Sequence, residues 1–587
     1  MLIVLQGGFG NLVTCLCGVI VCIVGGIGAL RSKRRNDRIL LLPLLFFSLA
    51  CCYMASAIAN GLTLTTLSET GVWFGVAGMA LLAGGQTLDQ RTRTISLIAW
   101  AGLASSVLGT FVFLGILPFP GGMNDGRLQF FFQYANTAGI WFAAASALCF
   151  LSSSERLRSF ASLPLAALLL TQSGGAILVF LIGFVVAAVC WCRANRYTRL
   201  TLSVCQALLA LIIFAGLNLE HGLLGLALVA AAIGFSFAIP QLEKLLTGIR
   251  RQRPAAASVL AIAVIAAVAT LALFSDRVHA AAASLIERLY HIADGIAMYA
   301  SSPLLGVGPD NWQYLYPYIQ TAQYHTTVVH SSYVQVALDS GAVGFVLLAC
   351  AIAIGVKHLL RPGRTNSDVA ASAAALLVAA HALIDFDLQF GAIAFFLAFL
   401  LSAPQGPSVP SKSLWLGLAC LVLGAPACSA GALAEASKIG LSLANATGDY
   451  REAQGMFEQN PFAQSDVAAQ TEYLAASYGL GDSSQIEAFL ERFGVSSDRQ
   501  AMYVAASLYE SGETQRAGEV LIEQLEVQPY NDEFFRSVKT MIEIYGLDDV
   551  LKDRYNAAVA NASGLAASSS NWLPEQEVLD TYAYERR

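Results

Sequence analysis

Charged residues are scarce in this chain. Asp, Glu, Lys and Arg make up 13% of its 587 residues, whereas soluble globular proteins carry about 25%. Hydrophobic residues reach 56%, and the mean hydropathy is +0.60. This composition excludes an ordinary soluble enzyme and indicates an integral membrane protein. Because helices satisfy their own backbone hydrogen bonds in a bilayer, the long apolar runs predict an all-α, polytopic fold.

Cysteine pairs and metal-ligand spacings are also missing. All twelve cysteines precede residue 430, nearly all of them within apolar runs. The C-terminal part therefore has no disulfide framework, and no spacing typical of a metal site occurs. Gly306 and Gly308 do not form a nucleotide-binding loop, because no strand precedes them and no Gly-Lys pair follows. We expect no metal, no other cofactor and no nucleic-acid partner.

Acidic and basic residues are distributed unevenly. Residues 1–434 contain 23 Lys and Arg against 15 Asp and Glu, whereas residues 435–587 contain 11 against 25. The chain thus divides into a weakly basic membrane domain over residues 1–434 and a strongly acidic C-terminal part. In that part we expect a helical domain over residues 435–560 and a flexible tail over residues 561–587, which begins with many small and polar residues.

Basic residues are absent before the first apolar run, Asn11–Leu30, and cluster directly after it as Arg-Ser-Lys-Arg-Arg-Asn-Asp-Arg. A secretory signal peptide has the reverse order of charge. We therefore expect a first membrane span with its N-terminus outside, because Lys and Arg are enriched in cytoplasmic loops.

Further apolar runs bring the predicted number of membrane spans to about 14. With the N-terminus outside, 20 basic residues fall in cytoplasmic loops, and only Arg127, Arg277 and Arg288 fall in outer loops of the membrane domain. This asymmetry favours the topology over its mirror image and puts the C-terminal domain outside the cytoplasm. The runs after the first cover residues 39–59, 71–88, 94–117, 134–152, 160–171, 174–192, 200–216, 223–239, 255–274, 334–356, 368–384, 388–403 and 414–434.

Two of these assignments depend on a helix break. Basic clusters flank both ends of residues 160–192, so we expect a turn at residues 171–175. A single helix over residues 368–403 would hold Asp385 and Asp387 at mid-membrane, at a cost of about 2.5–3.5 kcal/mol for an aspartate. A split there puts both carboxylates at the outer surface. Without that split, the C-terminal domain would be cytoplasmic.

A polar loop over residues 275–333 is rich in Tyr, Gly, Pro and His. Long loops in membrane proteins are commonly functional. This loop contains Pro303-Leu-Leu-Gly-Val-Gly-Pro309, and it is followed by His330-Ser-Ser-Tyr-Val-Gln335 and Asp339-Ser-Gly-Ala-Val-Gly344. These phrases, in this order, resemble the signature loop of the bacterial O-antigen ligase and polymerase superfamily.

Two further segments carry the resemblance, which covers residues 120–400 approximately. Arg127-Leu-Gln-Phe-Phe-Phe-Gln-Tyr-Ala-Asn-Thr-Ala138 is similar to the family's loop of arginine, aromatic residues and asparagine before a span. Ala380-His-Ala-Leu-Ile-Asp-Phe-Asp-Leu388 is similar to its late turn with His and Asp-Phe-Asp. Arg288 matches the family arginine that precedes the first signature phrase.

The resemblance implies a membrane fold of the glycosyltransferase C type. Such an enzyme moves a glycan from undecaprenyl diphosphate to a hydroxyl acceptor on the outer side of the cytoplasmic (inner) membrane. Because the lipid diphosphate is already an activated donor, the transfer can proceed without a metal. The acceptor stays open among lipid A core, a growing lipid-linked polymer, a cell-wall polymer and a protein Ser or Thr. In one departure from the family, its usual Ser-Arg turn reads Gln172-Ser-Gly-Gly175 here.

Arginines are the candidates for binding the anionic donor. A diphosphate needs fixed positive charge, and the planar guanidinium suits phosphate oxygens. We assign this role to Arg127 and Arg288, against the alternative that each is simply solvated at the surface. Arg277 directly follows a span and is expected to be an interfacial anchor.

His330 is the candidate catalytic residue. A histidine at this position can accept a proton from the acceptor hydroxyl, or it can stabilise the leaving diphosphate as a cation. The alternative is a structural imidazole at the membrane interface. We assign no catalytic role to His325 or His291.

Asp385, Asn136 and Tyr134 are candidates for supporting roles. Asp385 either orients a basic residue or a sugar hydroxyl, or it caps the predicted turn. Asn136 and Tyr134 either contact the sugar, by hydrogen bonding or by stacking, or they support the fold.

The acidic C-terminal domain contains helical patterns in which small residues recur, for example over residues 448–457 and 503–517. These patterns resemble degenerate tetratricopeptide-type helix pairs. Such a unit either binds a protein partner or covers a site. The alternative is a helical cap without a ligand.

Three other functions remain open. A protein O-oligosaccharyltransferase would use the same donor. A transporter or flippase for a lipid-linked glycan would suit the many spans, although the polar residues gather in predicted outer loops and no chain of charges lies within the spans. A non-catalytic scaffold acting through its C-terminal domain would tolerate the loss of His330.

Overall fold

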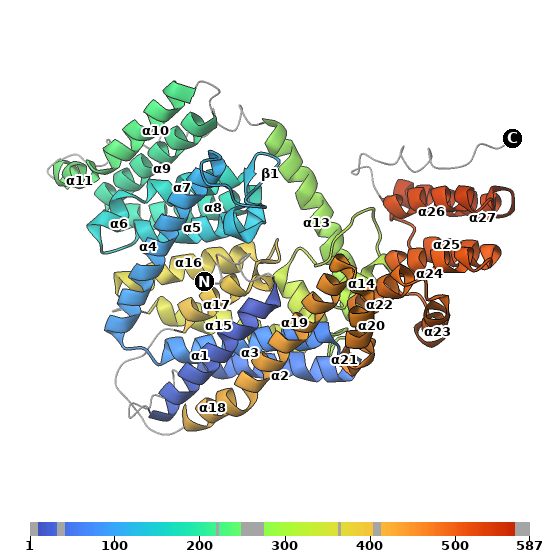
Figure 1. The fold of residues 1–587 in the computed structure, drawn as a ribbon. Helices are drawn as coiled ribbons and strands as arrows, with labels where there is room; N and C mark the ends of the chain where they lie inside the picture. Colours follow the sequence, from blue (N-terminus) through green and yellow to red (C-terminus); the bar gives the residue numbers. More distant parts are fainter. Residues whose placement is uncertain are drawn as a thin grey trace. The chain divides into compact units, whose positions relative to one another are not determined.

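The computed structural model describes residues 10–31, 41–218, 222–247, 275–361, 365–402 and 413–569. In these ranges the chain is almost entirely helical, with a single two-stranded antiparallel hairpin, in which Met123 pairs with Leu128 and Asn124 with Arg127. The all-α prediction is therefore confirmed (Figure 1).

The elements of the N-terminal half are α1 (Asn11–Arg31), α2 (Leu41–Asn60), α3 (Leu64–Gly84), α4 (Leu88–Phe113), β1 (Met123–Asn124), β2 (Arg127–Leu128), η3 (Phe130–Phe132), α5 (Ala135–Phe150), α6 (Glu155–Ser159), α7 (Ser162–Thr171), α8 (Gly174–Arg193), α9 (Tyr197–Asn218), α10 (Gly222–Ser236) and α11 (Ile239–Thr247). The middle of the chain forms α13 (Ser275–Ser301), α14 (Trp312–Leu315), η4 (Tyr316–Tyr318), α15 (Ser332–Leu359), α16 (Asn366–His381), η5 (Asp387–Gln389), α17 (Gly391–Leu401), α18 (Ser413–Ala419), η6 (Cys420–Gly424) and α19 (Ala425–Thr447). The C-terminal helices are α20 (Tyr450–Glu458), α21 (Pro461–Gln464), α22 (Val467–Gly479), α23 (Ser483–Phe493), α24 (Asp498–Glu510), α25 (Thr514–Val527), α26 (Asp532–Ile544) and α27 (Asp548–Ser569).

The chain divides into two compact units. The first comprises residues 1–48, 74–282 and 347–426, and the second comprises residues 49–73, 283–346 and 427–587. Each unit is described separately below.

Eight helices in the described ranges are long and apolar enough to cross a membrane. They are α1, α2, α3, α4, α8, α9, α15 and the continuous helix Leu414–Thr447, and a pair bent by 52°, Ala227–Ser236 with Ile239–Thr247, raises the number to nine. The chain is thus a polytopic membrane protein, while the number 14 stays a prediction. The run 255–274 lies outside the described residues, as does most of the basic cluster after α1.

Both predicted helix breaks are present. α7 ends at Thr171, Gln172 adopts a left-handed conformation (φ +50°), and Ser173 caps α8 by accepting a hydrogen bond from Ala176 N. α16 ends at His381 and α17 begins at Gly391. Neither Asp385 nor Asp387 is exposed, and their place at the outer surface of the membrane stays a prediction. Both lie in a turn that is enclosed by protein.

The core of the first unit forms around α5. Every residue from Ala135 to Cys149 is buried, and α5 packs against α4, α7, α8 and α16. Small residues permit this close packing, since a side chain at Gly139 would meet Ser173 and Ala176 of α8. α5 therefore places its own N-terminal residues among several buried neighbours.

A buried ion pair joins three other helices of the first unit. Arg91 of α4 is 1% exposed, and its Nε lies 3.3 Å from Asp368 Oδ1 of α16. The same guanidinium donates to the carbonyl oxygens of Phe399 (3.2 Å) and Leu400 (2.7 Å), where α17 ends. The end of α17 thus gains donors for carbonyls that the helix itself leaves without partners.

The second unit contains an irregular segment inside α15. Gly341 has φ +73° and ψ −175°, which interrupts the helix. In a regular helix, Ala342 N would donate to the Leu338 carbonyl. Here Ala342 N donates to Pro303 O (2.8 Å), and Leu338 O accepts from Val307 N (2.7 Å). Two hydrogen bonds to the loop over residues 302–311 replace one within the helix.

Glycine is required on both sides of this contact. Gly306 has φ +77°, and a Cβ placed on it would collide with the Leu338 carbonyl. A Cβ on Gly341 would collide with the Leu304 carbonyl. Both positions therefore need the conformational freedom and the small size of glycine. The first and third signature phrases, more than 30 residues apart, form one packed structure.

Asp339 fixes the same loop from the other side. It is 1% exposed and accepts hydrogen bonds from Gln335 Nε2 (2.9 Å), Asp310 N (3.2 Å) and Tyr53 OH (3.2 Å). Gln335 in turn accepts from Val329 N at 3.0 Å. The residue before His330 and the loop after Gly306 are thus both held by the start of α15.

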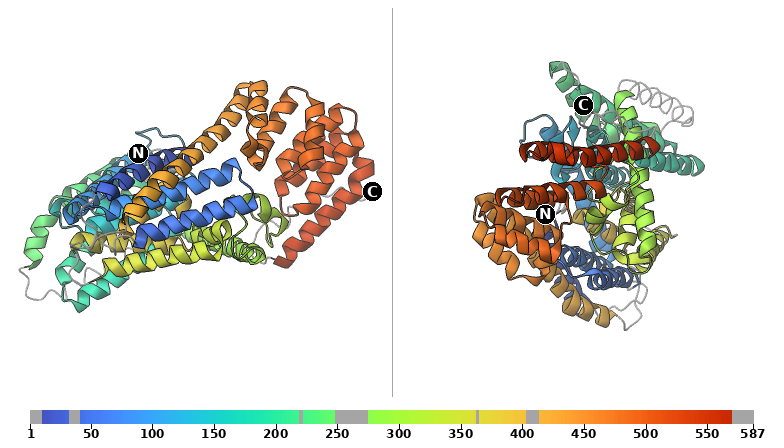
Figure 2. Two further views of the ribbon diagram at one scale, coloured as in Figure 1. Left: turned by 90° about the horizontal axis from the view of Figure 1, so that it is seen from below. Right: turned by 90° about the vertical axis from the view of Figure 1, so that its right-hand side faces the viewer.

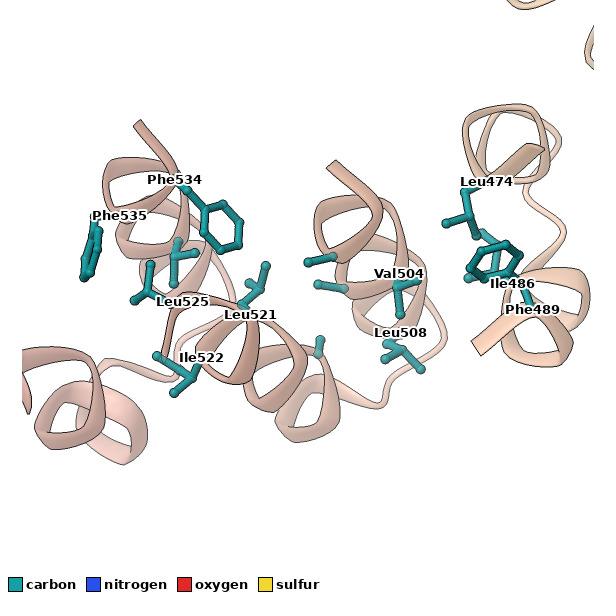
Figure 3. Packing of buried hydrophobic residues seen from close by; sticks show 14 of the residues in the cluster. Leu474, Ile486, Phe489, Val504, Leu508, Leu521, Ile522, Leu525, Phe534 and Phe535 are labelled. Carbon is teal, nitrogen blue, oxygen red and sulfur yellow. The ribbon is translucent and has the colours of Figure 1, made fainter. Parts of the chain in front are cut away.

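Helical hairpins form the C-terminal part of the second unit. Glycines with positive φ stand between paired helices at Gly448, Gly481, Gly512 and Gly546, at intervals of 33, 31 and 34 residues. Successive helices lie beside one another (Figure 2). Their shared core includes Leu474, Ile486, Phe489, Val504, Leu508, Leu521, Leu525, Phe534 and Phe535 (Figure 3). The hairpin spacing agrees with a tetratricopeptide-like domain, which stays a prediction.

The boundaries of this domain differ from those expected. The last apolar helix runs without a break from Leu414 to Thr447, so residue 435 lies inside a helix. At the other end, α27 continues to Ser569, so residues 561–569 are helical where a flexible tail was predicted. Residues 570–587 lie outside the described residues.

The glycine contact predicts a selective loss of stability. Gly341→Ala should lower the melting temperature of the detergent-solubilised protein by several degrees, because the new methyl group collides with the Leu304 carbonyl in a strained backbone conformation. Gly564→Ala is the matched control. That glycine lies within α27 with nothing within 4 Å of its Cβ position, so alanine should leave the melting temperature unchanged or raise it slightly. Equal melting temperatures for both variants would contradict this interpretation of the helix break.

Candidate active site

Four of the predicted site residues form a continuous chain of hydrogen bonds in the first unit. Arg127 Nη2 donates to Asn136 Oδ1 (3.0 Å), Asn136 Nδ2 donates to Tyr134 OH (2.8 Å), and Tyr134 OH donates to Asp385 Oδ1 (3.1 Å). We call this the Arg127–Asp385 chain. It joins β2, the beginning of α5 and the turn after α16.

Backbone groups hold both ends of the Arg127–Asp385 chain. Arg127 Nε donates to the Thr171 carbonyl at 3.1 Å, where α7 ends. Asp385 Oδ1 accepts from Phe386 N at 2.9 Å. Asn136 is 8% exposed and Asp385 is not exposed, whereas Arg127 and Tyr134 are partly exposed. The chain thus leads from a partly exposed cation to an enclosed carboxylate.

Aromatic packing fixes the tyrosine in this chain. The ring of Tyr134 stacks on Phe386, with centroids 4.8 Å apart, and lies nearly parallel to Phe390 at 6.0 Å. Such stacked pairs restrict the ring beyond what area burial alone does. The hydroxyl of Tyr134 donates to Asp385, and the choice between a sugar contact and a structural role stays open.

A second polar group lies beside the Arg127–Asp385 chain. His381 Nδ1 lies 2.6 Å from Asp387 Oδ2, and Asp387 Oδ1 accepts from Thr137 Oγ1 at 3.2 Å. His381 and Asp387 are fully buried, and a Cβ on Gly175 would come within 3.0 Å of His381 Nε2. Sequence reasoning quoted His381 and Asp387 in a family phrase but assigned neither a role. Their adjacency to Asp385 in that phrase was the available signal.

His330 and Arg288 belong to the second unit. The His330 ring lies 5.0 Å, centroid to centroid, from the ring of His291 on α13. Arg288 is one turn earlier on α13, and both it and His330 act electrostatically on His291. The structure thus groups two predicted residues around a histidine to which sequence reasoning gave no role.

His291 is enclosed and neutral. It lies outside the membrane-spanning helices and is 1% exposed. Burial, with the nearby His330 and Arg288, lowers the pKa of His291 to about 3. Glu287 Oε1 lies 3.7 Å from His291 Nε2, which is too long for a hydrogen bond. Burial also raises the pKa of Glu287, against the opposing effect of Arg288. Because His291 is neutral near pH 7, its contact with Glu287 is not an ion pair there.

Tyr324 also packs against His291. The two ring centroids are 4.2 Å apart, and Tyr324 OH donates to Asp294 Oδ2 at 2.6 Å. Asp294 also accepts from Thr321 N (2.9 Å) and Thr321 Oγ1 (2.7 Å). Burial and the hydrogen bond to Asp294 raise the pKa of Tyr324 well above its usual value. The sequence analysis did not identify Asp294 as a site residue. The one available signal was its position one helical turn after His291.

His325 takes a different place. Its Nδ1 lies 3.1 Å from Tyr316 OH, and its side chain is exposed. Tyr316 stacks between Trp312 (5.3 Å) and Tyr324 (5.5 Å) in a buried aromatic cluster.

No group of three or more His, Cys, Asp or Glu side chains suited to a metal ion occurs in the ranges that the structure describes. Arg277 lies in α13, and its side chain is not among those that the structure describes. The two polar groups contain arginine cations, a half-buried histidine and enclosed carboxylates. Such groups can bind an anion and move a proton.

Removing one hydroxyl tests the Arg127–Asp385 chain. Tyr134→Phe keeps the stacked ring but takes the donor from Asp385 and the acceptor from Asn136. Leaving buried groups without partners costs about 1–3 kcal/mol, so we expect the melting temperature to fall by a few degrees. Tyr503→Phe, at a partly exposed tyrosine of α24, should have no effect. If Tyr134→Phe melts like the wild type, the chain does not stabilise the fold.

The low pKa of His291 predicts a pH-dependent stability. A histidine in the unfolded chain binds a proton near pH 6.5, whereas folded His291 does so only at about 3. Between these values the unfolded state binds more protons, so stability falls as the pH falls. Melting temperatures of the wild type and His291→Phe, measured from pH 7.5 to pH 5, should diverge, with the wild type losing more. A parallel decline would show that His291 is not held neutral.

Comparisons with known proteins bear on one part of the chain. Residues 208–349 match the family model described as O-antigen ligase. This range contains Arg288, His291, His330 and the packed signature phrases. No curated protein and no solved structure matches the chain. The family match supports a membrane glycosyltransferase-like activity. The match supports the resemblance to the O-antigen ligase and polymerase superfamily that the signature phrases carry.

Proposed function

We propose that the chain is a glycosyltransferase that moves a glycan from a polyprenyl diphosphate to a hydroxyl acceptor on the outer side of the cytoplasmic membrane. The observation that carries this proposal is the grouping of Arg288, His291 and His330 within the part that matches the O-antigen ligase family. A cation and a half-buried imidazole in one place suit a reaction with an anionic leaving group and a proton to move.

The proposed transfer is a substitution at the anomeric carbon of the donor. The acceptor oxygen forms a bond to that carbon, and the bond between the carbon and the phosphate oxygen breaks. The electron pair of that bond leaves with polyprenyl diphosphate. His330 either accepts the proton of the acceptor hydroxyl or, as a cation, stabilises the leaving diphosphate. Arg288 offsets the negative charge that develops on the phosphate.

Arg127 is the second proposed donor-binding residue. Thr171 O and Asn136 Oδ1 fix its guanidinium, so little side-chain freedom remains to be lost on binding an anion. Gln172, in the turn where relatives commonly carry an arginine, donates to Gly126 O at 3.2 Å. Arg127 therefore contacts that same turn and can supply the positive charge that the turn lacks. Asn136, Tyr134 and Asp385 would act through Arg127.

The proposed orientation follows from the charge distribution. The N-terminus and the C-terminal hairpin domain would lie outside the cytoplasm, and the basic loops inside. The hairpin domain would bind either the acceptor or a protein partner. Its acidic composition suits a basic or neutral partner rather than an anionic one.

An in vitro transfer reaction tests the proposal. Purified full-length protein is mixed with native lipid-linked glycan and membrane extract, and the products are read by mass spectrometry. His330→Ala should lower the rate by about 10²–10⁴-fold, the usual contribution of an acid–base residue. Arg127→Ala and Arg288→Ala should mainly weaken donor binding. His325→Ala is the matched control and should keep the wild-type rate.

The products also decide between the open acceptors. Longer lipid-linked chains identify a polymerase, glycan on another lipid or polymer a ligase, and glycan on Ser or Thr a protein O-oligosaccharyltransferase. An authentic donor left untouched by the wild type would contradict the proposal and favour transport. Full activity of His330→Ala would contradict the proposed catalytic role of His330.

A further inference from the structure

We propose that His291 is a positioning residue, which fixes the ring of His330 by packing against it rather than by a hydrogen bond. This inference rests on the proposed function of His330. It gives a role to a buried polar side chain that the transfer chemistry does not otherwise use.

The packing of His291 carries the inference. The ring centroid of Tyr324 lies 4.2 Å from that of His291. The ring centroid of His330 lies 5.0 Å from that of His291, and the planes of the two histidine rings form an angle of 46°. Tyr324 cannot easily shift, because Asp294 accepts its hydroxyl and also holds Thr321. His291 therefore transmits a rigid position from α13 to His330.

The ring nitrogens of His291 argue against an alternative role as a hydrogen-bonding partner. Both are buried, and neither makes a hydrogen bond to any residue that the structure describes. An imidazole buried in this way costs stability. A phenylalanine would fill the same space without that cost. The imidazole is thus used here for its flat, neutral ring.

Charge explains why a neutral ring matters beside His330. The titratable and charged groups around the pair are Glu287, Arg288 and Asp294 of α13, together with Tyr324 of the loop. Arg288 already places one cation there. A second cation at His291 would disfavour protonation of His330. The low pKa of His291, about 3, prevents this at physiological pH.

Chemical modification of histidine tests the inference without any enzyme assay. Diethyl pyrocarbonate acylates neutral imidazole, so the rate of His330 modification against pH, followed by mass spectrometry, reports the pKa of His330. Exposed His325 serves as an internal reference in the same molecules. In His291→Phe this pH dependence should equal that of the wild type, because the ring removed carried no charge. In His291→Gln the rate at His330 should rise several-fold, because the ring that covers it is gone, while His325 reacts unchanged.

Transfer kinetics give the second readout. His291→Phe should keep most of the wild-type kcat. His291→Gln, which retains hydrogen-bonding groups but no ring, should lower kcat by about 10- to 100-fold, as expected when a catalytic group is misplaced. Melting temperatures of both variants, measured in the same detergent, show that each is folded.

Several results would overturn the inference. Rescue by Gln with loss in Phe would mean that His291 acts through a hydrogen bond. A shift of the His330 titration to higher pH in His291→Phe would mean that His291 carries a positive charge. A wild-type protein that transfers no glycan would instead refute the proposed function, and the modification rates would still decide whether His291 positions His330.

Discussion

The loop that carries His330 depends on an exchange of backbone hydrogen bonds at Gly341. The helix gives up the bond between Ala342 N and Leu338 O, and each group pairs with the loop instead, through Pro303 O and Val307 N. Because a buried backbone group without a partner is costly, neither the helix break nor the loop is stable alone. Asp339 adds bonds to Asp310 N and Gln335, which reaches the residue before His330. The polar loop is thus part of a folded scaffold.

Arg127 and His330, the two candidate reactive side chains, are held in place by different kinds of contact. In the first unit, Arg127 is held by hydrogen bonds through Asn136 and Tyr134 to Asp385. In the second, His330 is held by ring packing against His291. A guanidinium has several directed donors that acceptors can fix. A histidine that must gain or lose a proton is better held by contacts that do not depend on its charge state.

Periodicity and charge predict much of this fold. Most apolar runs lie close to described helices, but α3 begins seven residues before its run and the helix Leu414–Thr447 ends thirteen residues after its run. The basic clusters around residues 160–192 correctly required the break at Gln172. Arg127, Tyr134 and Asn136 were named as candidates from one phrase and Asp385 from another, but the hydrogen bonds that join them were not predicted. The burial of Asp385 was not predictable, because a turn in sequence does not show which residues cover it. The place of His291 depends on tertiary packing against Tyr324, for which no local pattern exists.

The central proposal is that the Arg127–Asp385 chain and the group around His330 each lie on the outer side of the membrane. It is tested most directly by labelling from one side. In a variant without its twelve native cysteines, single cysteines replace the exposed Asp125 and His325, and spheroplasts are treated with a membrane-impermeant maleimide. The account predicts that both positions react in intact spheroplasts. Protection of either position until the membrane is permeabilised would put that polar group on the cytoplasmic side and contradict the account.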